Sequence, residues 1–215
     1  MPKHTPTPMP TPMPMQTLPF HVQGRSLWLR CGACALVWVM ATGVAQAQTT
    51  APDNPNAEFS RPEISALRGA VPTAPVRLRV WGFDVYDARL WTPMGFRHSQ
   101  AVQFLFALEL QYLRRLEGAA IVSRSIDEMR RVGSFTESQA QNWSMAMREF
   151  FPNVNAGERI TGVNLPGVGA EFWVNGQRVG VVKDPAFARL FFGIWLDERT
   201  SEPKMRAQLL QGLQP

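Results

Sequence analysis

A strand, a two-residue turn, a second strand and two helices are predicted in that order within residues 170–212, and this order restricts the fold more than any other feature. Asn175-Gly176 separates two β-rich runs, 170–174 and 177–182. A type I′ turn needs a positive φ angle at both central residues, which Asn and Gly tolerate best. The pair therefore predicts a β-hairpin with antiparallel strands.

Two helices are predicted after this hairpin. Asp184-Pro185 marks the start of the first, because Asp caps a helix N-terminus and Pro needs no backbone N–H there. Apolar side chains then recur at three- and four-residue spacing, which makes one wide apolar face; they are Phe187, Leu190, Phe191, Ile194 and Trp195. A second, shorter helix begins at Ser201 and ends at Gly212.

The preceding part of the chain predicts strands first and helices second. Val76–Trp81 and Phe83–Trp91 are β-rich runs joined at Gly82, typical of one kinked strand or two consecutive ones. Ala101–Leu113 predicts a largely buried strand, and Arg159–Leu165 a further one.

Two capping-box sequences, Ser125-x-x-Glu128 and Thr136-x-x-Gln139, predict the starts of two helices between these strands. The whole order is strands, two helices, strands, two helices. It indicates an α+β domain in which helices cover one face of an antiparallel sheet.

The first 47 residues have the pattern of an extension with a secretory signal peptide. Positive charge at Arg25 to Arg30 is followed by an apolar run, Cys31 to Val44, and by the small-residue cleavage site Ala45-Gln46-Ala47. The run is too short to span a membrane, which takes about 20 residues. We expect cleavage after Ala47, a periplasmic or secreted mature protein with no transmembrane span, a disordered lead-in at 48–60 and a domain at 61–213.

Cleavage would remove both cysteines and two of the three histidines. Both cysteines, Cys31 and Cys34, lie in the apolar run, and His98 is the one histidine outside the leader. We therefore expect no metal site, no disulfide and no cofactor. The leader holds three of the 22 basic residues and none of the 17 acidic ones, so the mature charge is only +2. Nucleic-acid binding is not expected from that balance.

Several stretches resemble the bacterial chalcone isomerase-like family. These stretches are Trp81–Trp91, Leu108–Leu113, Phe150–Val154 with Gly157, and above all Phe172–Leu210, with Asn175-Gly176, Asp184-Pro185, Phe191-Phe192-x-Ile194-Trp195-Leu196-Asp197 and Thr200-Ser201-Glu202-Pro203. The resemblance implies an open-faced β-sandwich: an antiparallel sheet covered by helices, with a ligand cleft between them. Relatives on this fold include flavonoid-cyclising plant enzymes and fatty-acid-binding proteins.

The resemblance carries over only part of the plant enzymes' catalytic set. Their strand arginine matches Arg77 or Arg79, which alternation places on one face of the strand. Their threonine falls on Tyr86, as in the fatty-acid-binding branch, and their late threonine or serine falls on Gln177. Their helix tyrosine and asparagine have no match. Flavonoid cyclisation is therefore not expected.

The remaining residues suggest a ligand site. Arg77 or Arg79 could grip a carboxylate with two parallel hydrogen bonds, and the Tyr86 hydroxyl could add a third. The first hypothesis is therefore an exported, cofactor-free protein that binds a small apolar carboxylic acid, fatty or aromatic. The alternative for these residues is a surface role for both arginines and a core role for Tyr86.

Two further functions remain open. The protein could be an isomerase, an intramolecular lyase that acts on a phenolic or enone substrate, with Tyr86 and an arginine stabilising a developing oxyanion. It could also be a non-catalytic accessory protein whose helical face contacts a periplasmic or membrane partner.

Overall fold

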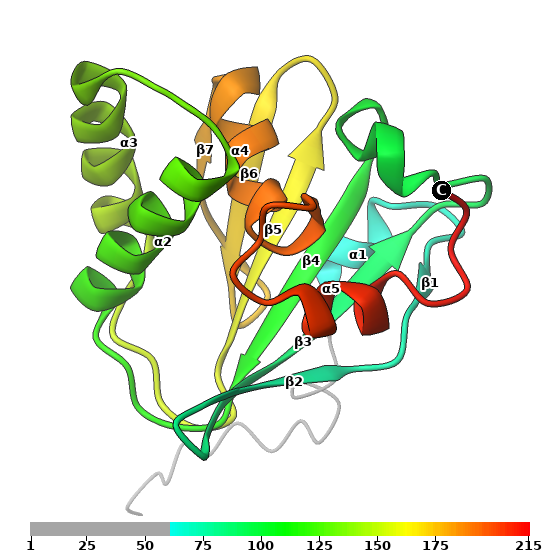
Figure 1. Cartoon of the computed structure of the whole chain (residues 1–215), viewed down its shortest axis with the longest axis horizontal. Coiled ribbons are helices and arrows are strands. Elements are labelled where there is room, and N and C mark those ends of the chain that lie inside the picture. The colour runs from blue at the N-terminus through cyan, green and yellow to red at the C-terminus, as the bar shows by residue number, and fades with distance from the viewer. Residues whose placement is uncertain (1–60) are drawn as a thin grey trace, which may run out of the picture. The chain divides into compact units, whose positions relative to one another are not determined.

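The computed structural model describes residues 61–215, so the predicted signal peptide and lead-in lie outside the described residues. The strands are β1 (Val71–Pro72), β2 (Val76–Val80), β3 (Phe83–Thr92), β4 (Phe106–Tyr112), β5 (Arg159–Leu165), β6 (Gly169–Val174) and β7 (Gln177–Val182). The helices are α1 (Pro62–Ser65), α2 (Gly118–Val132), α3 (Glu137–Phe150), α4 (Pro185–Leu196) and α5 (Pro203–Leu209), with a 3₁₀ helix, η2, at His98–Gln103. Figure 1 shows their arrangement around one sheet.

All strand pairs in this seven-stranded sheet are antiparallel, in the order β1-β3-β4-β5-β6-β7, with β2 also paired to β3. Because β4 occupies one edge of β3, the short strands β1 and β2 share its other edge. The run around Gly82 is thus two strands that form a hairpin. The predicted α+β class, an antiparallel sheet carrying helices, is confirmed.

Strand alternation gives the sheet two different faces. On β4, Leu108 and Leu110 pack in the main core beneath the helices, whereas Ala107 lies on the opposite face with Leu67. Glu109, two residues after Ala107, is also on that opposite face. It forms an ion pair there with Arg61, the residue just before α1. Figure 1 shows α1 behind the sheet and α4 in front of it.

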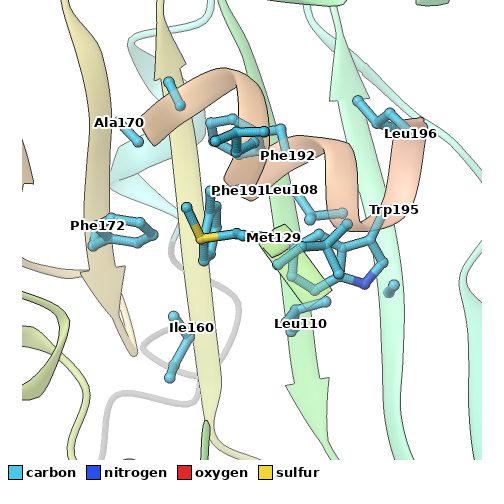
Figure 2. Close-up of a cluster of buried hydrophobic side chains, with 14 of the residues drawn as sticks. Leu108, Leu110, Met129, Ile160, Ala170, Phe172, Phe191, Phe192, Trp195 and Leu196 are labelled. Atoms are coloured by element: carbon cyan, nitrogen blue, oxygen red, sulfur yellow. The ribbon is translucent and has the colours of Figure 1, made fainter. Parts of the chain in front are cut away.

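Helix α4 forms the centre of the main core. Nine of its residues are buried, because it packs against the sheet on one side and against α2 on the other. Figure 2 shows Phe191, Phe192 and Trp195 of α4 among sheet residues such as Leu108 and Phe172. The Phe191 and Phe172 ring centroids lie 5.1 Å apart in an edge-to-face arrangement, which aromatic rings prefer.

Most predicted turns and caps are confirmed. Asn175 and Gly176 have φ angles of 50° and 80°, as a type I′ turn requires. Thr136 forms its capping box with Gln139, through Gln139 N–H to Thr136 Oγ1 at 3.2 Å and Thr136 N–H to Gln139 Oε1 at 2.9 Å. The Asp184 carboxylate accepts the Ala186 N–H at 2.8 Å, which caps α4.

Three predicted boundaries are wrong. Ser125 lies inside α2 and not at its start, because its hydroxyl donates to the Ile121 carbonyl one turn earlier, at 2.8 Å. The strand predicted from Ala101 begins only at Phe106, since residues 98–103 form η2. The last helix begins at Pro203, with Glu202 and not Ser201 as its N-cap.

Replacing Phe172 by alanine should destabilise the fold by about 3–5 kcal/mol, because the ring is fully buried and its loss leaves a cavity. Urea unfolding followed by circular dichroism measures this change. Val168→Ala, at a half-exposed turn residue, is the control and should have an effect near zero. A loss below about 1 kcal/mol for Phe172→Ala would contradict the packing of β6 under α4.

Candidate functional site

A cavity of about 680 Å³ lies between the helix-covered face of the sheet and helices α2, α4 and α5. Strands β2 to β5 supply its floor, including Leu78, Leu110 and Ile160. The helices supply the roof, including Ile121, Ile194 and Met205. Its walls are therefore mainly apolar, and its volume is in the range of ordinary small-molecule sites.

A β-bulge decides which side chains of the β2–β3 hairpin face this cavity. Leu78 pairs with Tyr86, but the next residue, Arg79, pairs with Asp84, so Val85 is the extra residue on β3. Alternation on β2 then directs Leu78 to the cavity and Arg79 away from it. On β3, Tyr86 lines the cavity beside Leu78.

The Tyr86 hydroxyl is held by the end of helix α4. Trp195 Nε1–H donates a hydrogen bond to the Tyr86 oxygen at 3.0 Å. Figure 2 shows the indole nitrogen directed toward β3. Because Trp195 uses the oxygen as an acceptor, the hydroxyl hydrogen of Tyr86 stays available, and no acceptor within residues 61–215 takes it. It can be donated to a bound molecule.

Tyr86 lies beside a second cavity-lining tyrosine, Tyr112, which is its register partner on β4. The two rings meet edge to face, with centroids 6.0 Å apart. Burial raises the pKa of both phenols well above its usual value. Nearby Glu202 and Glu128 raise the pKa of Tyr86 further. Both phenols are consequently neutral hydrogen-bonding groups at physiological pH.

Glu128 of α2 is a buried carboxylate at the cavity wall, with only 5% of its surface exposed. Its Oε1 is 2.7 Å from Nη2 of Arg124, one turn earlier on the same helix. Its Oε2 is buried and accepts no hydrogen bond from the described residues, and Arg131 Nε lies 3.7 Å from it. A buried carboxylate oxygen without a hydrogen-bond donor costs stability.

The turn of the β2–β3 hairpin also contributes to the cavity. Its exposed residues Val80, Trp81 and Phe83 belong to the lining, together with Arg114 from the loop after β4. The Arg114 guanidinium lies over the Phe83 ring, 5.3 Å from its centroid, in a cation–π contact.

The sequence predicts that Arg77 or Arg79 lies with Tyr86 in one site, but the structure separates both arginines from Tyr86. Neither arginine lines the cavity. Arg77 forms a bidentate ion pair with Asp87, at 2.8 and 2.9 Å, and a further contact of 2.8 Å to Asp84. Arg79 binds Asp84 at 2.6 Å, which lowers the pKa of that carboxyl.

Arg77 and Arg79 are directed away from the cavity because of strand periodicity. The two arginines do share one face, but alternation gives the opposite face of β2 to the cavity-lining Leu78 and Val80. The bulge at Val85 also brings Asp84 and Asp87 to the arginine face, although a regular strand would separate them.

Gln177 is likewise separate from the cavity. It is exposed at the start of β7 and lines a smaller hollow with residues such as Arg148 and Phe150. Of the four residues predicted to bind a ligand, only Tyr86 lines the cavity.

Sequence reasoning missed Glu128, Arg124 and Trp195 as site residues. The sequence predicts a capping box at Ser125-x-x-Glu128 and a core position for Trp195. A signal was present for Glu128, because it lies seven residues after Ile121 on the same stripe of α2. An acidic side chain on an otherwise apolar stripe indicates a buried carboxylate.

No group of histidine, cysteine or acidic side chains within residues 61–215 is arranged to hold a metal ion. None of the helices in that part of the chain is long and apolar enough to cross a membrane.

Comparison with known proteins gives a family and a fold. A family model described as chalcone isomerase-like matches residues 72–211. Among the solved structures that match is a fatty-acid binding protein of Arabidopsis thaliana, with a TM-score of 0.51 and 13% sequence identity over 66% of this chain and 87% of that chain. At this identity the likeness shows the fold alone. No curated protein matches the chain significantly.

The two tyrosines are the only ones in the chain, so their ionisation can be followed by ultraviolet absorbance. We expect no tyrosinate signal in the folded protein near pH 10, where unfolded protein in guanidinium titrates, because burial raises both pKa values. Above pH 10 the folded state retains protons that the unfolded state loses, so stability should fall as pH rises. Full titration near pH 10 without unfolding would contradict the raised pKa values of both phenols.

Proposed function

The chain belongs to the chalcone isomerase-like family, and on that basis we propose that it is an exported protein that binds a small apolar carboxylic acid, fatty or aromatic, without a cofactor. The observation that carries this proposal is the apolar cavity of about 680 Å³ with the Tyr86 hydroxyl in its wall. Apolar walls with a few polar groups are typical of sites that orient a small hydrophobic ligand by one end.

Tyr86 is the group proposed to hold the ligand's carboxyl end. Its hydroxyl hydrogen is free to donate, and the hydrogen bond from Trp195 fixes the position of its oxygen. Arg124 also lines the cavity and lies close enough to Tyr86 to influence its pKa, so it is the cation proposed to assist. These two residues replace the pairing of Tyr86 with Arg77 or Arg79.

The similarity to the Arabidopsis thaliana fatty-acid binding protein supports the same class of ligand. That protein shares the fold at low sequence identity, so the similarity suggests a ligand class without transferring individual residues.

Native mass spectrometry tests this proposal on protein produced by export from a bacterial host. We expect extra mass that leaves on denaturation, or that is acquired on incubation with palmitic and cinnamic acids. Tyr86→Phe should weaken acid binding by about tenfold or more, because a hydrogen bond to a charged group is lost. The double variant Arg77→Ala, Arg79→Ala is the matched control and should bind as the parent does, since neither side chain lines the cavity.

Other results would change the proposal. If Tyr86→Phe bound the acids as tightly as the parent, the Tyr86 hydroxyl would not be a group that holds the ligand. A bare protein mass after incubation with both acids would favour the accessory-protein function and a search for a protein partner. The same spectrum tests export, because cleavage after Ala47 predicts a chain that begins at Gln48.

One observation favours the second candidate function, an isomerase or intramolecular lyase. Glu128, a buried residue with a carboxylate oxygen that accepts no hydrogen bond from the described residues, lines the cavity together with Tyr86. A carboxylate can remove a proton from a bound phenol or enone and return it to another atom of the product. The Tyr86 hydroxyl would stabilise the oxyanion that forms meanwhile.

Glu128→Gln separates this function from simple binding. If Glu128 moves the proton, the variant should lose about 10²-fold or more of the conversion rate on a panel of phenolic enones, measured by chromatography of the isomers. Asp127→Asn, an exposed neighbour on the same helix, is the control and should keep the parent rate. Absence of conversion by the parent protein, or an unchanged rate in Glu128→Gln, would contradict a catalytic role for Glu128.

A further inference from the structure

The turn of the β2–β3 hairpin exposes an aromatic pair to solvent. Trp81 is 95% exposed and Phe83 is 62% exposed, and Val80 beside them is also exposed. We call residues Val80–Phe83 the hairpin tip. In Figure 1 this tip is the lowest part of the coloured ribbon, at the turn where β2 ends and β3 begins.

The identity of Trp81 does not follow from the needs of the turn. Trp81 and Gly82 have φ angles of 49° and 83°, almost the same as the 50° and 80° of Asn175 and Gly176. The chain thus builds two turns of the same form, one with the favoured Asn and one with Trp. A bulky residue at positive φ is unfavourable, and an exposed indole gains nothing from folding. A contact between Trp81 and another molecule would explain why this position holds a tryptophan.

Positive charge lies beside the hairpin tip. Arg114 stacks over Phe83, and its loop is tied to the hairpin by Leu113 N–H, which donates to the Val85 carbonyl at 2.9 Å. Arg115 follows and is exposed. The nearest acid on the hairpin, Asp84, is already paired with both arginines of β2, and the next acid after Arg115, Glu117, lies where α2 begins.

The same residues border the cavity. Val80, Trp81, Phe83 and Arg114 all belong to its lining, so a surface that receives the hairpin tip would lie beside the cavity. An apolar acid could then pass between that surface and the cavity without crossing water.

We propose that the hairpin tip docks on a membrane surface that contains anionic lipids, with Trp81 and Phe83 in the interfacial region and Arg114 and Arg115 against the headgroups. Tryptophan suits that region because its ring is apolar and its N–H is polar. Arginines beside it are attracted by anionic headgroups. This inference goes beyond ligand binding and does not require that the cavity be filled.

A lipid surface fits the tip better than a protein partner does. The apolar residues occupy the end of one narrow hairpin, whereas a protein interface usually needs a broad patch of about 800 Å² on each side. A short aromatic tip flanked by cations can enter the headgroup layer without such an area.

Co-sedimentation of the exported protein with vesicles tests the proposal, using phosphatidylcholine alone or with phosphatidylglycerol. We expect binding that is stronger to the anionic vesicles and is weakened by salt. Trp81→Asn should reduce vesicle binding by about tenfold or more, because the indole can no longer be buried. The same variant should unfold at an equal or higher urea concentration, because it creates the favoured Asn-Gly turn.

Two matched variants complete the test. Met94→Ser, at a turn residue that is 96% exposed and outside the cavity lining, should bind vesicles as the parent does. Arg114→Gln with Arg115→Gln should lose about fivefold per arginine on anionic vesicles only. No vesicle binding by the parent, or equal binding by parent and Trp81→Asn, would overturn the proposal. Ligand binding is measured separately in vesicle-free solution, so failure of one proposal is distinguishable from failure of the other.

Discussion

The packing of α4 against the sheet is the interaction on which the rest of the structure depends. Its aromatic side chains interlock with β6, as the Phe191 and Phe172 rings show. Because α4 lies over β5 and β6, α2 and α5 can both pack against it. The space between these helices and the β2–β3 hairpin remains as the cavity. The same helix ends at Trp195, which holds the Tyr86 hydroxyl. The core and the site therefore share this element.

The protonation and position of the polar groups in the cavity depend on the apolar residues around them. Burial keeps Tyr86 neutral, and Trp195 leaves its hydrogen free to donate. Glu128 is kept at the wall by its position on the buried stripe of α2, with Arg124 as its charged partner. A neutral donor beside a paired carboxylate suits a ligand that carries an oxygen at one end of an apolar body.

Elements with strong local signals were predicted correctly. Asn175-Gly176, Thr136 with Gln139, and Asp184-Pro185 each satisfy a turn or a cap through contacts within a few residues, so nearby sequence contains all the necessary information. Ser125 shows the limit of such signals, because a capping-box sequence also fits a helix interior when the serine bonds to the carbonyl one turn earlier. The site was only partly predicted. Tyr86 lines the cavity, but Arg77 and Arg79 are directed to the opposite side, where they pair with Asp84 and Asp87.

By itself the sequence determined the α+β class, the antiparallel hairpins and the aromatic face of α4, because these depend on residue periodicity and on turn chemistry. Only the tertiary structure decided which face of β2 borders the cavity, since that choice depends on long-range packing and on the bulge at Val85. It also decided that Glu128 and Trp195 approach the same cavity as Tyr86, from helices far apart in the chain. Local sequence specifies elements, whereas a site is made of side chains that meet only after those elements have packed.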